Sequence, residues 1–153
     1  MIDLEIPGFG RLELADLVCD YNGTLAQDGL PLPEVRERLA RLSAELRLHV
    51  VTADTFGTVR AAVADLGCRL VVLPAEEQAE GKRRYVESLA ARHVVAIGNG
   101  RNDRRMLAAA ALGVAVCGGE GLATEALQAS AIVVRDALDL LAHPARLKAT
   151  LRS

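Results

Sequence analysis

The stretch Leu-Val-Cys-Asp-Tyr-Asn-Gly-Thr, residues 17–24, decides the fold class of this chain. It begins inside a short apolar run and passes directly into a polar turn that contains glycine. An apolar run of this length, bounded by turn residues, indicates a buried β-strand. In open α/β sheets, ligands bind beyond the carboxyl ends of the strands. The stretch therefore predicts a buried strand with Asp20 at its ligand-binding end.

The same pattern of short apolar runs recurs along the 153 residues. The expected strands are Ala15–Cys19, Leu46–Val51, Arg69–Leu73, His93–Ile97, Gly113–Val116 and Ala131–Val134. Segments with helical spacing of apolar residues alternate with them, at Pro33–Glu45, Thr55–Leu66, Lys82–Ala91, Asn102–Ala111, Gly121–Ala129 and Asp136–Leu151, the last with a break at Pro144. Alternating strands and helices indicate a mostly parallel sheet with helices on both faces, which is a three-layer, Rossmann-like α/β fold.

The chain is expected to form a single domain over residues 1–153, without repeats or linkers. A β-hairpin is expected over about residues 1–19, because the turn sequence Pro7–Gly10 separates two strand-like runs. The interval from Thr24 to Thr52 holds one helix and one strand, and the interval from Thr52 to Lys82 holds another helix, another strand and a short acidic loop. Neither interval has room for an inserted domain.

Composition excludes several classes of function. A net charge of −2, a pI near 5.9 and only 3% aromatic residues argue against a nucleic-acid-binding surface. The short basic cluster Arg101, Arg104 and Arg105 indicates a solvated helix face, with recruitment of an anion as the alternative. Three dispersed cysteines form neither a disulfide framework nor a zinc site. No apolar run is long enough to span a membrane, and no signal peptide is recognisable, so we expect a cytoplasmic protein.

Polar residues gather at three of the expected strand ends, while the strands themselves stay apolar. They are Asp20–Thr24, then Thr52-Ala53-Asp54, then Gly98–Asp103, and Lys82 follows a glycine at the expected start of a helix. A carboxylate can attack phosphorus and form an acyl phosphate that water later cleaves. Mg²⁺, a lysine and backbone N–H groups can hold the strongly anionic phosphoryl group. The set of residues indicates phosphoryl transfer.

These stretches, in this order, resemble the four motifs of the haloacid dehalogenase superfamily. The sequences DYNGT, TAD, a lysine after glycine, and GNGRND are similar in particular to the phosphorylation domain of P-type ATPases, with DKTGT, TGD, Lys and GDGxND. The segment GVAVCGGEGLATEALQASAIVV, residues 113–134, resembles the segment after the last motif in those pumps. The chain is most similar to the small soluble P-type ATPase-like phosphatases of prokaryotes, and the resemblance covers essentially the whole chain.

The resemblance implies a role for each matching residue. Asp20 would be the nucleophile and a metal ligand, and Asn22 would offer its backbone carbonyl to Mg²⁺. Thr52, Ala53 and Gly23 would bind the phosphoryl oxygens, and Lys82 would neutralise both nucleophile and phosphate. Asn99 and Asp103 would complete the metal site, with Thr24, Asp54 and Asn102 as supporting residues.

Two residues depart from the pattern of the family's phosphatases. Asn22 stands where most of them have the aspartate that acts as general acid and then base, and an amide cannot exchange that proton. Asn99 stands where the family usually has an aspartate that binds Mg²⁺. We therefore expect a slow hydrolase with weak Mg²⁺ binding that improves when phosphate is present.

Other interpretations remain open from the sequence. Asp20 would be an ordinary turn residue, Lys82 a surface lysine, and Asn99, Asn102 and Asp54 turn or helix-cap residues. At the level of function, the alternatives to a Mg²⁺-dependent phosphohydrolase are a weak or inactive module that binds phosphate or a nucleotide, and a carrier of phosphate on Asp20. The site would be open and capless, with only a small hairpin flap at Gln27–Leu32. It would suit a small phosphorylated substrate or a phosphoprotein, and resemblance to capless members of the family implies a homo-oligomer, a tetramer or a dimer.

Overall fold

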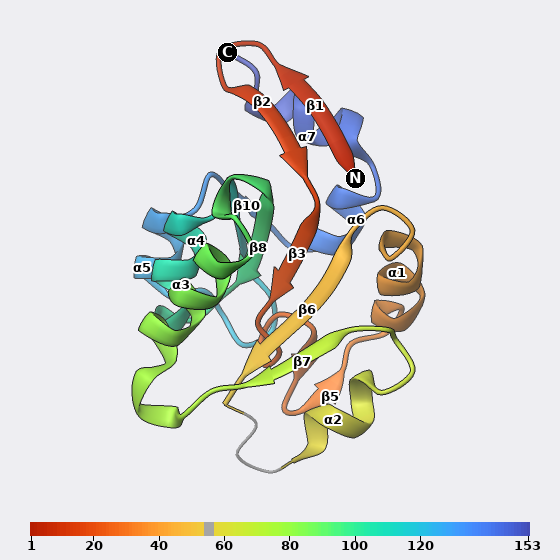
Figure 1. Cartoon of the computed structure of the whole chain (residues 1–153), viewed down its shortest axis with the longest axis vertical. Helices are drawn as coiled ribbons and strands as arrows, with labels where there is room; N and C mark the ends of the chain where they lie inside the picture. Colours follow the sequence, from red (N-terminus) through yellow and green to blue (C-terminus); the bar gives the residue numbers. More distant parts are fainter. Residues whose placement is uncertain (54–56) are drawn as a thin grey trace.

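A parallel six-stranded sheet forms the centre of the computed structural model, which describes residues 1–53 and 57–153 (Figure 1). Its strands are β3 (Asp16–Cys19), β6 (Arg47–Thr52), β7 (Arg69–Val72), β8 (Val94–Gly98), β9 (Leu112–Val116) and β10 (Ile132–Val134). They lie in the order β10-β9-β8-β3-β6-β7, and every neighbouring pair is parallel. The expected fold class is confirmed, and the central strand is the one that leads to Asp20.

Two apolar layers cover the sheet, because successive residues of a strand point to opposite faces. Leu17 and Cys19 pack on one face with α1 (Val35–Leu42), α2 (Thr58–Val63), α6 (Ala137–Leu141) and α7 (Pro144–Leu151). Val18 packs on the other face with α3 (Gln78–Ser88), α4 (Arg104–Ala109) and α5 (Thr124–Ala129). The expected helical stretch 136–151 is divided, as expected, just before Pro144. Within the described residues, no helix is long and apolar enough to cross a membrane.

Two antiparallel hairpins stand apart from the main sheet. The first joins β1 (Ile2–Ile6) to β2 (Gly10–Leu14) and packs against α7 (Figure 1). The second joins β4 (Ala26–Gln27) to β5 (Leu30–Pro31), and it is the small flap expected at Gln27–Leu32. The first hairpin ends at Leu14 rather than at residue 19, because from Asp16 onward the chain pairs in parallel with β6 and β8 instead.

A second difference concerns the segment before Lys82. The acidic stretch from Ala75 to Glu80 was expected to be a loop, but it folds into a short 3₁₀ turn, η1 (Ala75–Glu77), and the first turn of α3. Acidic side chains are favourable in the first turn of a helix. Lys82 therefore lies in the second turn of α3 and not at its start.

A buried polar chain joins the central strand to α3. The carboxylate of Asp16, fully buried at the start of β3, accepts two hydrogen bonds of 2.7 Å from Arg47 and lies 3.0 Å from His49 Nε2. The other ring nitrogen of His49 lies 2.8 Å from the hydroxyl of Tyr85, which is on α3. Since Tyr85 is three residues after Lys82, this chain helps to fix the helix that carries Lys82.

Replacement of Asp16 by Asn should lower the free energy of unfolding at neutral pH by about 2 kcal/mol, because a charged hydrogen-bond acceptor is lost. Burial raises the pKa of Asp16, but the hydrogen bonds from Arg47 and His49 outweigh it and hold that pKa below its ordinary value of 3.8. The stabilisation is therefore complete above pH 3.8 and is lost as the pH falls through the lower folded-state pKa. Urea unfolding of both proteins at pH 7 and pH 3 measures this difference, and an equal gap at both pH values would contradict it.

Candidate active site

The strand order brings the three polar strand ends together. Cys19, the last residue of β3, lies beside Val50 of β6 and Ile97 of β8. Asp20 therefore lies between the end of β6 and the end of β8. After β3, the chain forms β6 and β7 on one side of it and then β8, β9 and β10 on the other side, so the strand order reverses at β3. Such a reversal of strand order is where open α/β sheets bind their ligands.

Lys82 joins two carboxylates at this point. Its Nζ donates a hydrogen bond of 2.7 Å to Asp20 Oδ1 and another of 2.7 Å to Asp103 Oδ1. Lys82 and Asp103 are fully buried, and Asp20 is 8% exposed. The interpretation of Lys82 as a surface lysine is therefore wrong. Asp20 is the member of this group that a solvent molecule or a ligand can reach.

The carboxylate of Asp103 also organises the loop after β8. Its Oδ2 accepts the backbone N–H groups of Asn99, at 3.0 Å, and Gly100, at 2.9 Å. A side chain at Gly98 could not fit, since its Cβ would lie 2.5 Å from that carboxylate. Both oxygens of Asp103 are thus engaged by the protein itself.

The loop after Asp20 is tightly folded around one carbonyl group. The oxygen of Tyr21 accepts the N–H groups of Thr24, Leu25 and Ala26 at 2.8–3.2 Å. Gly23 has φ +77 and lies against the side chain of Asn99, which a Cβ at position 23 would meet at 2.3 Å. Only glycine suits such a position. The glycine thus lets the loop after Asp20 approach Asn99 closely.

Asn99 links this loop to a second one. Its Nδ2 donates to the carbonyl oxygen of Gly121 at 3.1 Å, and its Oδ1 accepts a long hydrogen bond of 3.4 Å from the hydroxyl of Thr24. The carbonyl oxygen of Gly121 can only accept a hydrogen bond, so the side chain at position 99 must supply an N–H donor, which the amide of asparagine does. An aspartate at position 99 could not make this bond, which gives the asparagine a structural reason.

The charges of the buried group shift the pKa values of its members. Burial raises the pKa of Asp20, Asp103 adds to this effect, and Lys82 offsets only part of it, which places that pKa at about 6. For Lys82, burial lowers the pKa, but the two carboxylates outweigh it and raise the pKa above its ordinary value. Lys82 is therefore held as a cation beside a carboxyl group whose pKa is about 6.

Comparison with known sequences gives two informative matches, whereas no protein-family model matches the chain. The chain is 50% identical, over 62 residues, to an uncharacterized protein of Methanocaldococcus jannaschii, covering 39% of this chain and 67% of that protein, and so belongs to one family with it. It is 36% identical over 116 residues, 74% of its length, to a probable copper-transporting ATPase of Arabidopsis thaliana. It spans 12% of that ATPase.

Solved structures share the architecture over most of the chain. The cobalt-bound deoxy-D-mannose-octulosonate 8-phosphate phosphatase of Haemophilus influenzae matches with a TM-score of 0.66 at 17% identity, over 89% of each chain. The corresponding phosphatase of Moraxella catarrhalis, in complex with magnesium, phosphate and KDO, gives 0.68 at 13% identity over 92% of this chain and 88% of that one. A phosphoserine phosphatase gives 0.69 at 13% identity, over 85% and 98%.

A HAD-family hydrolase of Streptomyces avermitilis also matches, with a TM-score of 0.64 at 17% identity over 80% of this chain and 76% of that one. The chain has the haloacid dehalogenase fold.

Within this haloacid dehalogenase fold, some of the expected site residues are buried in one group and others are exposed. Asp20, Lys82 and Asp103 form the buried group, and Thr52 is buried at the end of β6. Asn22 is exposed beside them, and Ala53 is half-buried after β6. Asn102 is exposed in η3 (Arg101–Asp103) and does not cap α4, whose cap position is Asp103. Asp54 lies outside the described residues.

Tyr21 and Glu120, which were not among the expected site residues, both contact the flap. The buried Tyr21 donates its hydroxyl proton to the carbonyl oxygen of Gly29, at 3.3 Å, in the flap. Glu120 accepts the backbone N–H of Asp28, also in the flap, at 2.8 Å. The glycines around Glu120 indicate a loop in the sequence, but nothing in the sequence indicates that this loop reaches the flap.

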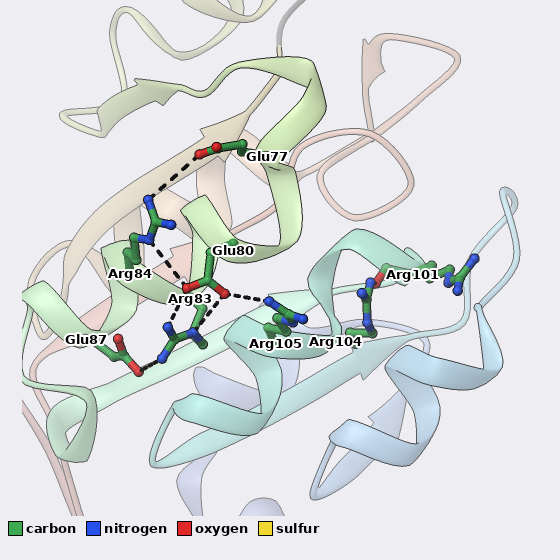
Figure 2. Close-up of polar contacts among 8 residues, drawn as sticks. All are labelled: Glu77, Glu80, Arg83, Arg84, Glu87, Arg101, Arg104 and Arg105. Carbon is green, nitrogen blue, oxygen red and sulfur yellow. Dashed lines mark hydrogen bonds and ion pairs between the residues drawn. The ribbon is translucent and has the colours of Figure 1, made fainter.

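Arg105 of the basic cluster near the last motif joins a network of paired charges around Glu80 on α3 (Figure 2). Glu80 accepts hydrogen bonds from Arg83, Arg84 and Arg105, and Arg101 pairs with Glu125 at 3.0 Å. The bond from Arg83, followed by that from Arg105, lowers the pKa of Glu80 to about 2. Two of the three arginines are therefore paired with carboxylates, and Arg104 donates to the backbone carbonyl of Arg101 at 2.7 Å, in keeping with a solvated helix face.

Proposed function

We propose that the chain is a phosphohydrolase that works through an aspartyl-phosphate on Asp20. The observation that carries this proposal is the bridge from Lys82 to Asp20 and Asp103 at the carboxyl end of the central strand. The bridge holds a partly exposed carboxylate beside a fixed positive charge. Such a charge attracts a phosphate and lowers the barrier for its transfer. The phosphatase names of the structural neighbours support the same chemistry.

The reaction would proceed in two displacements at phosphorus. An oxygen of Asp20 attacks the phosphorus atom, the bond to the leaving-group oxygen breaks, and an acyl phosphate forms. Water then attacks the same phosphorus atom, releasing phosphate and restoring the carboxylate. The leaving group must gain a proton in the first displacement and the water must lose one in the second. Asn22 can serve neither transfer.

A divalent cation would supply charge neutralisation and orientation of the phosphate in this site. Within residues 1–53 and 57–153, no three His, Cys, Asp or Glu side chains gather as a metal-binding group. Of the expected ligands, the Asp20 oxygen not bonded to Lys82, the backbone carbonyl of Asn22 and Oδ1 of Asn99 would hold Mg²⁺. Both oxygens of Asp103, the fourth expected ligand, are already bonded within the protein. Mg²⁺ commonly uses one or two carboxylates with substrate phosphate and water, so this set fits Mg²⁺ in the company of a phosphate. The magnesium-bound Moraxella catarrhalis neighbour supports this assignment.

The open surroundings of Asp20 bear on the choice of substrate. In the described residues, the chain between Gly23 and Lys82 holds only the flap, α1, α2, η1, two strands of the sheet and the first turn of α3. No inserted domain covers the site in that part of the chain. The proposed substrates are therefore a small phosphorylated compound or a phosphoprotein, and a homo-oligomer would enclose a small substrate better than a monomer.

Hydrolysis of para-nitrophenyl phosphate and acetyl phosphate, with and without Mg²⁺, tests the proposed function. The protein must have a verified intact mass, because asparagine is chemically labile and Asn22 must not have become aspartate. Mg²⁺-dependent turnover that disappears in Asp20→Asn would support the proposal. Absence of turnover on both compounds would overturn the proposed hydrolase activity and direct attention to phosphorylation of Asp20 by itself.

Replacement of Asn22 by Asp should increase turnover of an alkyl phosphate about 10²-fold, because general acid–base catalysis contributes at least that factor. Acetyl phosphate has a leaving group that needs no proton, so its turnover should change much less. Steady-state rates on both compounds measure the contrast, with Gln128→Glu, which changes an exposed amide on α5 to a carboxylate, as the matched control. Equal effects on the two compounds would refute the assignment of the missing acid to position 22.

A further inference from the structure

The loop after β9 lies against the flap and does not merely connect two elements. We call Gly118–Gly121 the glycine loop. Glu120 Oε1 in this loop accepts the backbone N–H of Asp28, at the tip of the flap, at 2.8 Å. Gly119 leaves room for the side chain of Gln27, whose amide oxygen would lie 2.2 Å from a Cβ at position 119. The glycine loop is thus shaped to receive the flap.

The opposite side of the flap tip is tied to the residue next to the nucleophile. The carbonyl oxygen of Gly29 accepts the hydroxyl proton of Tyr21 at 3.3 Å. Tyr21 is 2% exposed, and its backbone N–H bonds the carboxylate of Asp20. A movement of the flap tip therefore acts on the residue that orients Asp20.

The base of the glycine loop returns to the same place. Gly121 accepts a hydrogen bond from Asn99, which in turn accepts one from Thr24 in the loop after Asp20. The contacts form a closed ring from Tyr21 through the flap, Glu120, Gly121 and Asn99 back to the loop of Asp20. Glu120 is the one charged side chain among these ring contacts, and it is exposed, so the packed core does not depend on it.

We propose that Glu120 is a positioning residue of the Asp20 site, an inference that rests on the proposed function. Its carboxylate holds the flap tip against the glycine loop, and through Tyr21 this contact fixes the loop that carries Asp20. At the hairpin tip, Asp28 and Gly29 have φ of +51 and +78, and the N–H of Asp28 is bonded outside the hairpin, to Glu120. Glu120 would act without touching the substrate.

Glu120→Ala and Glu120→Gln together test this role. The alanine variant should speed hydrogen exchange at the Asp28 amide about tenfold, because a hydrogen bond to a charged acceptor shifts an opening equilibrium by that factor. It should also lower kcat/KM by about fivefold to tenfold, since misplaced catalytic groups slow the reaction. Glutamine keeps the accepting oxygen and should restore both values to within about twofold.

Thermal unfolding and a distant control separate positioning from general damage. The Tm of Glu120→Ala should equal that of the wild type, and Glu5→Ala, on the far hairpin, should change neither exchange nor kinetics. Unchanged exchange at Asp28, unchanged kcat/KM, or failure of glutamine to rescue would each overturn the role of Glu120. Absence of turnover in the wild type would instead overturn the proposed function, while exchange at Asp28 would still report the contact.

Discussion

Replacement of Lys82 by Met should lower the free energy of unfolding by about 3–5 kcal/mol, which is the usual effect of removing one partner from a buried ion pair. Lys82 is fully buried and holds both Asp20 and Asp103 at 2.7 Å. Without it, two carboxylates face each other with no cation between them. Methionine has a similar length and no charge, so the change tests the charge rather than the packing.

The same substitution should abolish measurable hydrolysis, because the fixed positive charge beside Asp20 is lost. The destabilisation should be smaller at pH 5 than at pH 8, since protonation of Asp20 removes one of the two opposing charges. Urea unfolding at both pH values and hydrolysis of acetyl phosphate measure these effects. Lys148→Met, at the exposed lysine on α7, is the matched control. A Lys82→Met protein as stable as this control would contradict the buried bridge.

Replacement of Asp20 by Asn should reduce turnover at least about 10⁴-fold, as removal of a covalent nucleophile commonly does. It should nevertheless stabilise the protein. The pKa of Asp20 is raised from 3.8 to about 6, so ionising this carboxyl group in the folded state carries a free-energy cost. Two pKa units correspond to roughly 3 kcal/mol. Asparagine removes that cost and leaves Lys82 paired with Asp103.

The sign of this effect fixes its pH dependence. Because the folded-state pKa is raised, the wild type loses stability as the pH rises from 3.8 through about 6. The free energy of unfolding of Asp20→Asn should therefore exceed that of the wild type most at pH 7 and equal it near pH 4. Urea unfolding with a chelator present, which keeps divalent cations away from Asp20, measures the difference. An Asp20→Asn protein less stable than the wild type at pH 7 would contradict the claim that ionised Asp20 destabilises the folded state.

Much of this site was predictable, because strand ends in a parallel sheet converge on one edge. Asp20, Lys82 and Asp103 are far apart in the sequence. Asp20 and Asp103 each come after a short apolar run that predicts a buried strand, and Lys82 lies on the helix expected between two such strands. The structure joins these three residues at 2.7 Å, in keeping with the expectation that they act together. The fold was predictable for the same reason.

The remaining features depend on contacts that no local pattern records. The hairpin was expected to extend to residue 19, but strand pairing with β6 and β8 ends it at Leu14. The contact between Glu120 and Asp28 joins residues 92 positions apart through a backbone N–H, which any residue type could supply. The buried pairing of Asp16 with His49 likewise depends on sheet register, and a charged residue at a strand start gives no sign of it.

The position of β3 in the sheet has a consequence for how the chain folds during synthesis. This strand is made first among the six, but its neighbours are Arg47–Val50 and Val94–Ile97. The strand that leads to Asp20 stays unpaired on one side until about two thirds of the chain has left the ribosome. Contacts so distant in sequence slow folding and lengthen the time during which apolar segments are exposed. The strand that leads to Asp20 therefore completes its pairing only after β8 has been made, and its apolar side chains stay without one of their two strand neighbours until then.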